Sequence, residues 1–85
     1  MLSDEFTLLR LRVVADADAG ALARVLERFQ YLNAVPRKVL AELSTRGVFH
    51  IEIDITGITP RCMDIIAAKI GEVPCIHSAR WHPLS

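Results

Sequence analysis

The sequence predicts an α+β fold in which two helices cover one face of an antiparallel sheet, in the order β-α-β-β-α-β. Residues 49–56 alternate between apolar and polar side chains, as expected for a strand with one buried face. Residues 21–32 and 60–71 instead place apolar residues at helical spacing. The chain has 85 residues, of which 52% are apolar, so residues 1–85 are expected to form a single domain.

The first strand and helix are expected at residues 6–14 and 21–32. In the strand, Arg10 and Arg12 alternate with apolar side chains. Residues 16–20 contain two aspartates and a glycine, which break the strand just ahead of a helix N-terminus. Asn33 is expected to end the helix in the left-handed conformation. The apolar stripe of this helix comprises Leu22, Val25, Leu26 and Phe29.

The second and third strands are expected at residues 37–44 and 49–56, joined by a hairpin loop at residues 45–47. In the third strand His50, Glu52, Asp54 and Thr56 form the polar face. In the second strand one face carries Val39, Ala41 and Leu43.

The second helix is expected to begin after Thr59, a capping residue, with Pro60 at its first position, and to close at Gly71. A last strand follows at residues 75–81, ended by Pro83. Right-handed crossovers and the hairpin then lead to a ferredoxin-like βαββαβ sandwich with sheet order 4-1-3-2 and both helices on one face. The apolar stripe of the second helix comprises Met63, Ile66, Ala67 and Ile70.

The charge balance argues against two kinds of partner. Ten basic residues face ten acidic ones, whereas binding to nucleic acid or to an anionic membrane needs a basic surplus. The start of the chain lacks the basic flank and apolar core of a signal peptide, and no apolar run is long enough for a membrane span. Cys62 and Cys75 cannot form the disulfide framework of a small secreted domain. A reduced, cytoplasmic protein is expected.

The mean hydropathy of +0.32 is high for so short a chain, which has little interior and much surface. Part of the apolar surface is therefore expected to be covered by a partner. One candidate surface is the edge of the second strand. The other is the outer side of the second helix, where Cys62, Ile65 and Ala68 lie off the core stripe. The sequence thus predicts a dimer or higher oligomer.

Motifs for catalysis or metal binding are weak. No nucleophile motif or phosphate-binding glycine loop occurs. His50 and His77 are expected on strands separated by a third, roughly 10 Å apart, too far to share a metal ion. No cofactor or metal is expected.

The open face of the sheet leaves two interpretations. Arg10 and Arg12 can pair with Glu52 and Asp54 across neighbouring strands, giving a solvated face whose charges cancel. Alternatively, a small dimeric enzyme would use His50, Glu52 and Asp54 on this face. That enzyme would need a cleft over the sheet and perturbed pKa values.

The loop at residues 16–20 also has two interpretations. Gly20 would let the backbone approach a ligand, and the helix N-terminus would supply N–H donors to the carboxylate of a small amino acid. The residues alone favour a simpler role, in which Asp16 or Asp18 caps the helix.

The run from Asp18 to Phe29, after a strand and before Asn33, resembles the first helix of ACT domains. Residues 51–56, with Pro60-Arg61 and the helix that follows, continue the resemblance, which covers residues 6–82. Within that family the chain most resembles the small regulatory subunit of acetohydroxyacid synthase (acetolactate synthase).

The resemblance implies a non-catalytic regulatory module for a catalytic subunit of branched-chain amino-acid synthesis. Such domains pair side by side, often into an eight-stranded sheet, and many bind an amino acid at the interface. Ala17 stands where valine-responsive members of the family carry an asparagine. Val35 stands where the second contact region of the family usually carries a polar residue. By position, the effector site comprises Asp16, Ala17, Asp18, Ala19 and Gly20 of one copy and Asn33, Ala34 and Val35 of the other.

Overall fold

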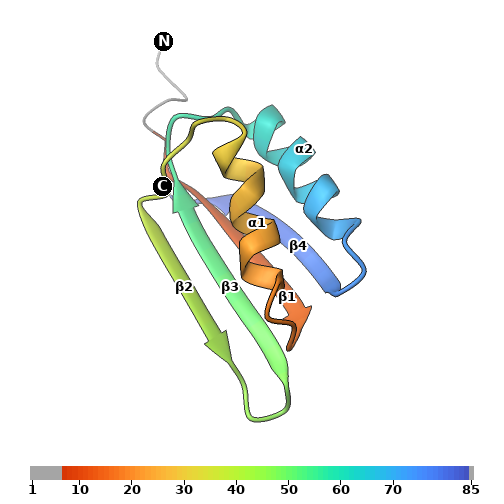
Figure 1. Cartoon of the computed structure of the whole chain (residues 1–85). Helices are drawn as coiled ribbons and strands as arrows, with labels where there is room; N and C mark the ends of the chain where they lie inside the picture. The colour runs from red at the N-terminus through yellow and green to blue at the C-terminus, as the bar shows by residue number, and fades with distance from the viewer. Residues whose placement is uncertain (1–6, 85) are drawn as a thin grey trace.

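The computed structural model describes residues 7–84 and shows the predicted βαββαβ order (Figure 1). The strands form one antiparallel sheet in the order β2-β3-β1-β4, which confirms the predicted topology. Within the described residues, neither helix is long and apolar enough to cross a membrane. The elements are β1 (Leu9–Asp16), α1 (Ala21–Gln30), β2 (Lys38–Leu43), β3 (Val48–Ile55), α2 (Pro60–Gly71) and β4 (Ile76–Pro83).

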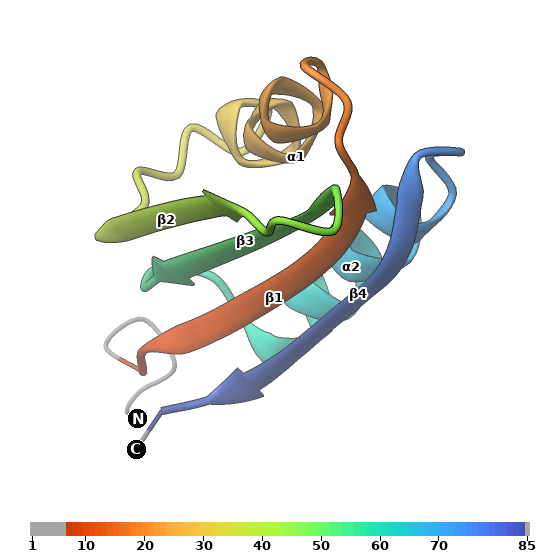
Figure 2. The same ribbon diagram turned by 90° about the horizontal axis from the view of Figure 1, so that it is seen from below.

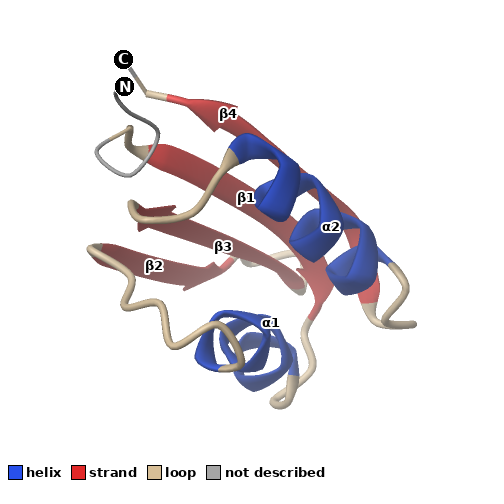
Figure 3. Cartoon of the chain, turned by 90° about the horizontal axis from the view of Figure 1, so that it is seen from above, coloured by secondary structure: helices blue, strands red, loops and turns tan. Residues whose placement is uncertain are grey.

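The core lies between the helices and the two central strands. Both helices lie on the same side of the sheet, and α2 runs alongside β4 (Figures 1 and 3). Alternate residues of β1 and β3 point toward the helices because successive side chains of a strand point to opposite faces. The largest fully buried side chains are Phe29, Leu9, Leu11, Ile51, Ile53, Ile55, Met63, Ile70, Val13 and Val25.

The helix boundaries are largely as predicted. The Thr59 hydroxyl oxygen accepts a hydrogen bond from the Cys62 N–H at 3.1 Å and caps α2. Gly71 is the last residue of α2. However, α1 ends at Gln30, so the prediction that it extends to Leu32 is wrong. The chain instead tightens into a turn, and Asn33 takes the predicted left-handed conformation, with φ of 55°.

The strand boundaries differ by a few residues from those predicted. β1 covers residues 9–16 rather than 6–14, and Phe6 lies outside the described residues. β2 covers residues 38–43 rather than 37–44, and β3 covers residues 48–55 rather than 49–56. β4 covers residues 76–83 rather than 75–81. Pro83 belongs to β4 as its last residue, a position where no further ladder bond is needed. His77 is a bulge residue that the register of β1 and β4 skips.

β2 is an exposed edge strand. Its residues Val39, Ala41 and Leu43 lie opposite Ile53, Ile51 and Phe49, so they share one face, as predicted, and it is the helix-covered face. All six residues of β2 are nevertheless exposed, and Leu43 is 61% exposed. β2 lies at the edge of the sheet (Figure 2), and its apolar alternation does not correspond to burial in a single chain.

Two adjacent isoleucines of α2 test the packing directly. Ile66 is 5% exposed in the core and Ile65 is 53% exposed on the outside. Ile66→Ala should lower the free energy of unfolding by about 2–5 kcal/mol, because it removes buried methyl groups and leaves a cavity. Ile65→Ala, the matched control, should change it by about 0.5 kcal/mol or less. Urea denaturation followed by circular dichroism measures both, and equal losses would contradict this packing.

Candidate functional site

The loop between β1 and α1 is held by hydrogen bonds of two aspartates, Asp16 at the end of β1 and Asp18 in the loop. The Asp18 carboxylate accepts a hydrogen bond from the Gly20 N–H at 2.7 Å. The Asp16 carboxylate lies 2.6 Å from His77 Nε2, and the Asp16 N–H donates to the Cys75 carbonyl at 2.8 Å. Both aspartates thus shape the loop, and His77 is a partner that the sequence did not indicate.

The N-terminus of α1 retains free donors. Its N-cap residue is Gly20, and no described side chain caps the helix. The expectation that Asp16 or Asp18 caps the helix holds only at its very start, where the Asp18 carboxylate accepts from the N–H of the N-cap residue Gly20 and the Asp18 carbonyl accepts from the Ala21 N–H at 3.0 Å. The N–H groups of Leu22 and Ala23 have no acceptor within residues 7–84. Such donors favour an anionic ligand group.

A hollow of about 160 Å³ opens beside this loop. Its surface is largely apolar, and Asp18 is the acidic residue among the described residues that line it. Two of its lining residues come from the sheet, Leu43 at the end of β2 and Phe49 in β3, and the others are Ala17, Asp18 and Ala19. A small apolar group can therefore lie against the loop.

The second predicted segment lies at the opposite end of α1. Asn33, Ala34 and Val35 border another hollow, of about 320 Å³. α1 has ten residues, so the two segments are separated by roughly 15 Å. A single chain therefore does not bring the two halves of the predicted effector site together.

The open face of the sheet carries the predicted ion pairs. The Arg10 guanidinium binds both carboxylate oxygens of Asp54, at 2.7 and 2.8 Å. The Arg12 Nε lies 3.3 Å from Glu52, which also accepts from the Lys38 Nζ at 3.2 Å. Lys38 joins the network because Glu52 lies next to β2 as well as β1, and this contact depends on the register of β2 against β3, which pairs Lys38 with Asp54.

These pairs set the protonation of the two carboxylates. The hydrogen bond from Arg10 lowers the pKa of Asp54, against the opposing effect of burial. Burial would raise the pKa of Glu52, but the hydrogen bond from Lys38 and the charges of three cations lower it overall. Both groups therefore stay ionised and lack the raised pKa that a general acid requires.

The histidines and cysteines are dispersed. β1 separates β3, which carries His50, from β4, which carries His77. Among residues 7–84, no three His, Cys, Asp or Glu side chains cluster as metal ligands would. Cys62 and Cys75 are free, half-buried thiols. On the open face His50 borders a shallow hollow of about 270 Å³ that also includes Leu40 and Glu42.

The fold places the chain in the class of ferredoxin-like βαββαβ domains, and a family model identifies the family. Residues 3–85 match the family model described as ACT-like domain. The chain belongs to the ACT-like domain family, whose members are generally regulatory modules. A search of curated proteins finds no match.

Solved structures share the fold at low sequence identity. The C-terminal domain of the MgtC protein from Mycobacterium tuberculosis is 14% identical, with a TM-score of 0.77, over 99% of this chain and 94% of that one. The ACT domain of GTP pyrophosphokinase from Chlorobium tepidum is 13% identical, with a TM-score of 0.73, over 88% and 96%. A homoserine dehydrogenase from Thiobacillus denitrificans is 16% identical, with a TM-score of 0.76, over 99% of this chain and 19% of that one.

The ion pair of Asp54 makes stability depend on pH. Asp54 is 4% exposed, and Asp54→Asn should lower the free energy of unfolding by about 1–3 kcal/mol at pH 7. Because the folded-state pKa lies below the unfolded one, this contribution is present above about pH 4 and is lost as the pH falls through the folded-state value. The difference between wild type and variant should thus close toward pH 2.

Chemical denaturation across the pH series measures this difference. Glu42→Gln is the control, since Glu42 lies on the same face and is exposed. It should change stability by about 0.5 kcal/mol or less at every pH. A deficit for Asp54→Asn that is constant from pH 7 to pH 2 would refute the assigned ion pair.

Proposed function

We propose that this chain is a regulatory module that binds a small aliphatic amino acid between two of its own copies. It would transmit that binding to a catalytic enzyme of branched-chain amino-acid synthesis, as the resemblance to the small subunit of acetohydroxyacid synthase implies. Membership of the ACT-like family supports the regulatory role. The observation that carries the proposal is the division of the candidate site between the two ends of α1.

The exposed β2 edge supports pairing between copies. The Ser44 N–H donates to the Val48 carbonyl at 2.8 Å, which fixes the phase of the ladder. By alternation, the backbone N–H and C=O groups of Val39, Ala41 and Leu43 point to the free edge. An edge that is both apolar and unpaired is a template for a further strand. The β2 strand of a second copy can serve as this further strand.

Antiparallel pairing of two β2 strands would assemble the site. The end of β2 at Leu43 would then lie beside the start of the partner's strand, near Lys38. Leu43 lines the hollow next to Ala17, and Val35 and Pro36 come just before β2. The two hollows, which are apart in one chain, would therefore face each other across the pair.

The site chemistry favours an amino acid with a small apolar side chain. The free N–H groups of Leu22 and Ala23 suit its carboxylate. Asp18 lines the hollow, and its carboxylate would face the ammonium group of the amino acid. The remaining lining, which includes Ala17 and Ala19, is apolar and leaves about 160 Å³, enough for a short aliphatic side chain.

Pairing through β2 predicts a monomeric variant. Leu43→Lys places a charge in the paired edge, where burial without a partner is costly. Sedimentation velocity should show self-association weakened roughly tenfold or more, corresponding to about 1.4 kcal/mol. Thr45→Lys, in the exposed hairpin, is the control and should leave it unchanged. Unaltered dimerisation of Leu43→Lys would place the interface elsewhere.

Amino-acid binding predicts a ligand-dependent rise in melting temperature. Valine, leucine or isoleucine at 100 times its dissociation constant should stabilise the folded state by about 2.7 kcal/mol, seen by differential scanning fluorimetry. Ala17→Glu should abolish the shift because its carboxylate repels that of the ligand. Ala68→Glu makes the same change on the exposed side of α2 and should retain the shift. Absence of a shift with all three amino acids would sink this part of the proposal.

A further inference from the structure

A second apolar surface lies on the helical layer, apart from β2. It consists of Tyr31, Leu32 and Ile65, and Tyr31 is 77% exposed. These residues line a hollow of about 320 Å³ between the end of α1 and the stretch of α2 from Cys62 to Lys69. Cys62 also lines it, and most of its surface is apolar. Pairing of two copies through their β2 edges would leave this hollow uncovered.

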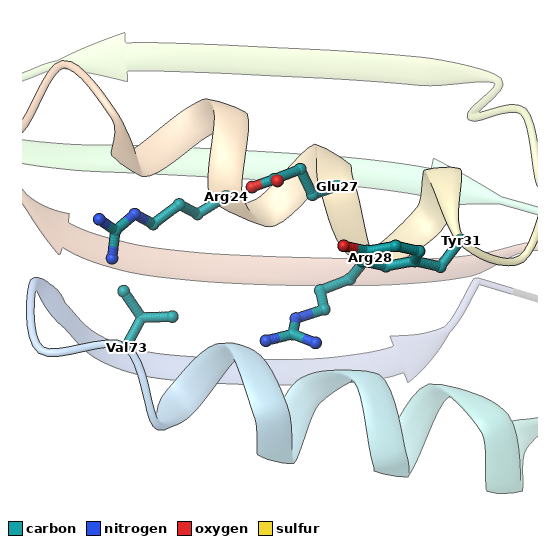
Figure 4. Close-up of a pocket in the computed structure, with 5 residues that line it drawn as sticks. All are labelled: Arg24, Glu27, Arg28, Tyr31 and Val73. Carbon is teal, nitrogen blue, oxygen red and sulfur yellow. The ribbon is translucent and has the colours of Figure 1, made fainter.

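The hollow continues along the helices into a more polar one of about 250 Å³. Arg28 and Tyr31 line both, so the two form one surface, here called the inter-helix groove. Arg24 and Arg28 lie one turn apart on α1, and their guanidinium groups extend toward the side where Val73 lies (Figure 4). Lys69, in the last turn of α2, lines the apolar hollow together with Arg28.

The groove carries an excess of positive charge although the chain is neutral overall. Arg24, Arg28 and Lys69 form no ion pair within residues 7–84. The one carboxylate that lines the groove in the described chain is that of Glu27, and it lies apart from both guanidinium groups in Figure 4. An apolar floor bordered by three cations, none of which is paired with a carboxylate in the described chain, is complementary to an acidic, amphipathic partner.

We propose that the inter-helix groove docks an acidic amphipathic helix of a partner protein. The partner's apolar side chains would bury Tyr31, Leu32 and Ile65, in the helix-in-groove mode of recognition. Its carboxylates would pair with the flanking arginines and Lys69, and an arginine can bind a carboxylate through two hydrogen bonds. This deepens the proposed function, because it names the surface through which the module would engage its catalytic partner.

Charge argues against a second copy as the occupant. A two-fold contact places the same patch against itself, so it would bring the three cations of each groove together. Shape argues against a membrane, because the groove is hollowed on both sides of Arg28 and needs inserted side chains. Both occupants are distinguishable outcomes of the test, because a second copy in the groove would make Arg28→Glu and Ile65→Asp lose dimerisation, and a membrane would bind the groove without peptide binding.

The test uses the full chain and a fluorescent peptide of about 14 residues, or about four helical turns. The peptide carries leucines at helical spacing flanked by glutamates, and a matched peptide replaces every glutamate with lysine. Fluorescence anisotropy should show saturable binding of the glutamate peptide alone. Arg28→Glu and Ile65→Asp should each weaken it roughly tenfold or more, since they reverse a bordering charge and interrupt the apolar floor.

Arg46→Glu is the charge-matched control, because Arg46 is exposed in the β2–β3 hairpin, away from both helices. It should bind the glutamate peptide as the wild type does. Circular dichroism establishes that each variant folds. The groove variants should keep dimerisation and the amino-acid response, whereas Leu43→Lys should lose these and still bind the peptide. The two proposals therefore fail separately.

Three results would overturn the groove proposal. The first is no saturable binding of the glutamate peptide up to about 1 mM, or equal binding of the lysine peptide. The second is unchanged binding by both Arg28→Glu and Ile65→Asp. The third is binding to anionic phosphatidylserine vesicles that Arg28→Glu removes, without peptide binding, which would assign the groove to a membrane surface.

Discussion

Two short helices cannot cover four strands, and this limit on burial governs the rest of the structure. α1 and α2 bury the inner faces of β1 and β3, whose apolar side chains there are almost fully enclosed. β2 continues the same face, with Val39 and Ala41 in register with the core residues Ile53 and Ile51, yet every residue of β2 is exposed. An apolar edge of this kind favours association with a further strand. The high proportion of apolar residues in the sequence therefore favours association between copies through β2.

The opposite face of the sheet needs no cover because its charges are paired. Arg10 and Asp54 form a two-bond contact between neighbouring strands, and Glu52 lies among three cations. A face neutralised in this way can meet water while the other face holds the core. The helical layer differs, since its cations lack anionic partners within the described chain. The open face of the sheet therefore neutralises its own charges, whereas the unpaired cations of the helical layer can pair with a partner.

Local pattern was enough to predict the fold but only part of the site. The alternation of residues 49–56 predicted β3, and its polar members predicted the pairing of Asp54 with Arg10. Pattern could not show that β2 lies uncovered, because apolar alternation looks the same under a helix or under a second copy. It also could not predict the contact of His77 with Asp16, which depends on a bulge, or the bond from Trp81 to Asp64, which depends on α2 packing against β4.

Assembly through β2 is tested most directly by hydrogen exchange of its own amides. The N–H groups of Val39, Ala41 and Leu43 point to the free edge, whereas those of Leu40 and Glu42 face β3 and act as an internal reference. NMR-detected exchange at increasing protein concentration should protect the first set progressively and leave the second unchanged. Fast exchange of the edge amides in a protein that sedimentation shows to be associated would contradict the account.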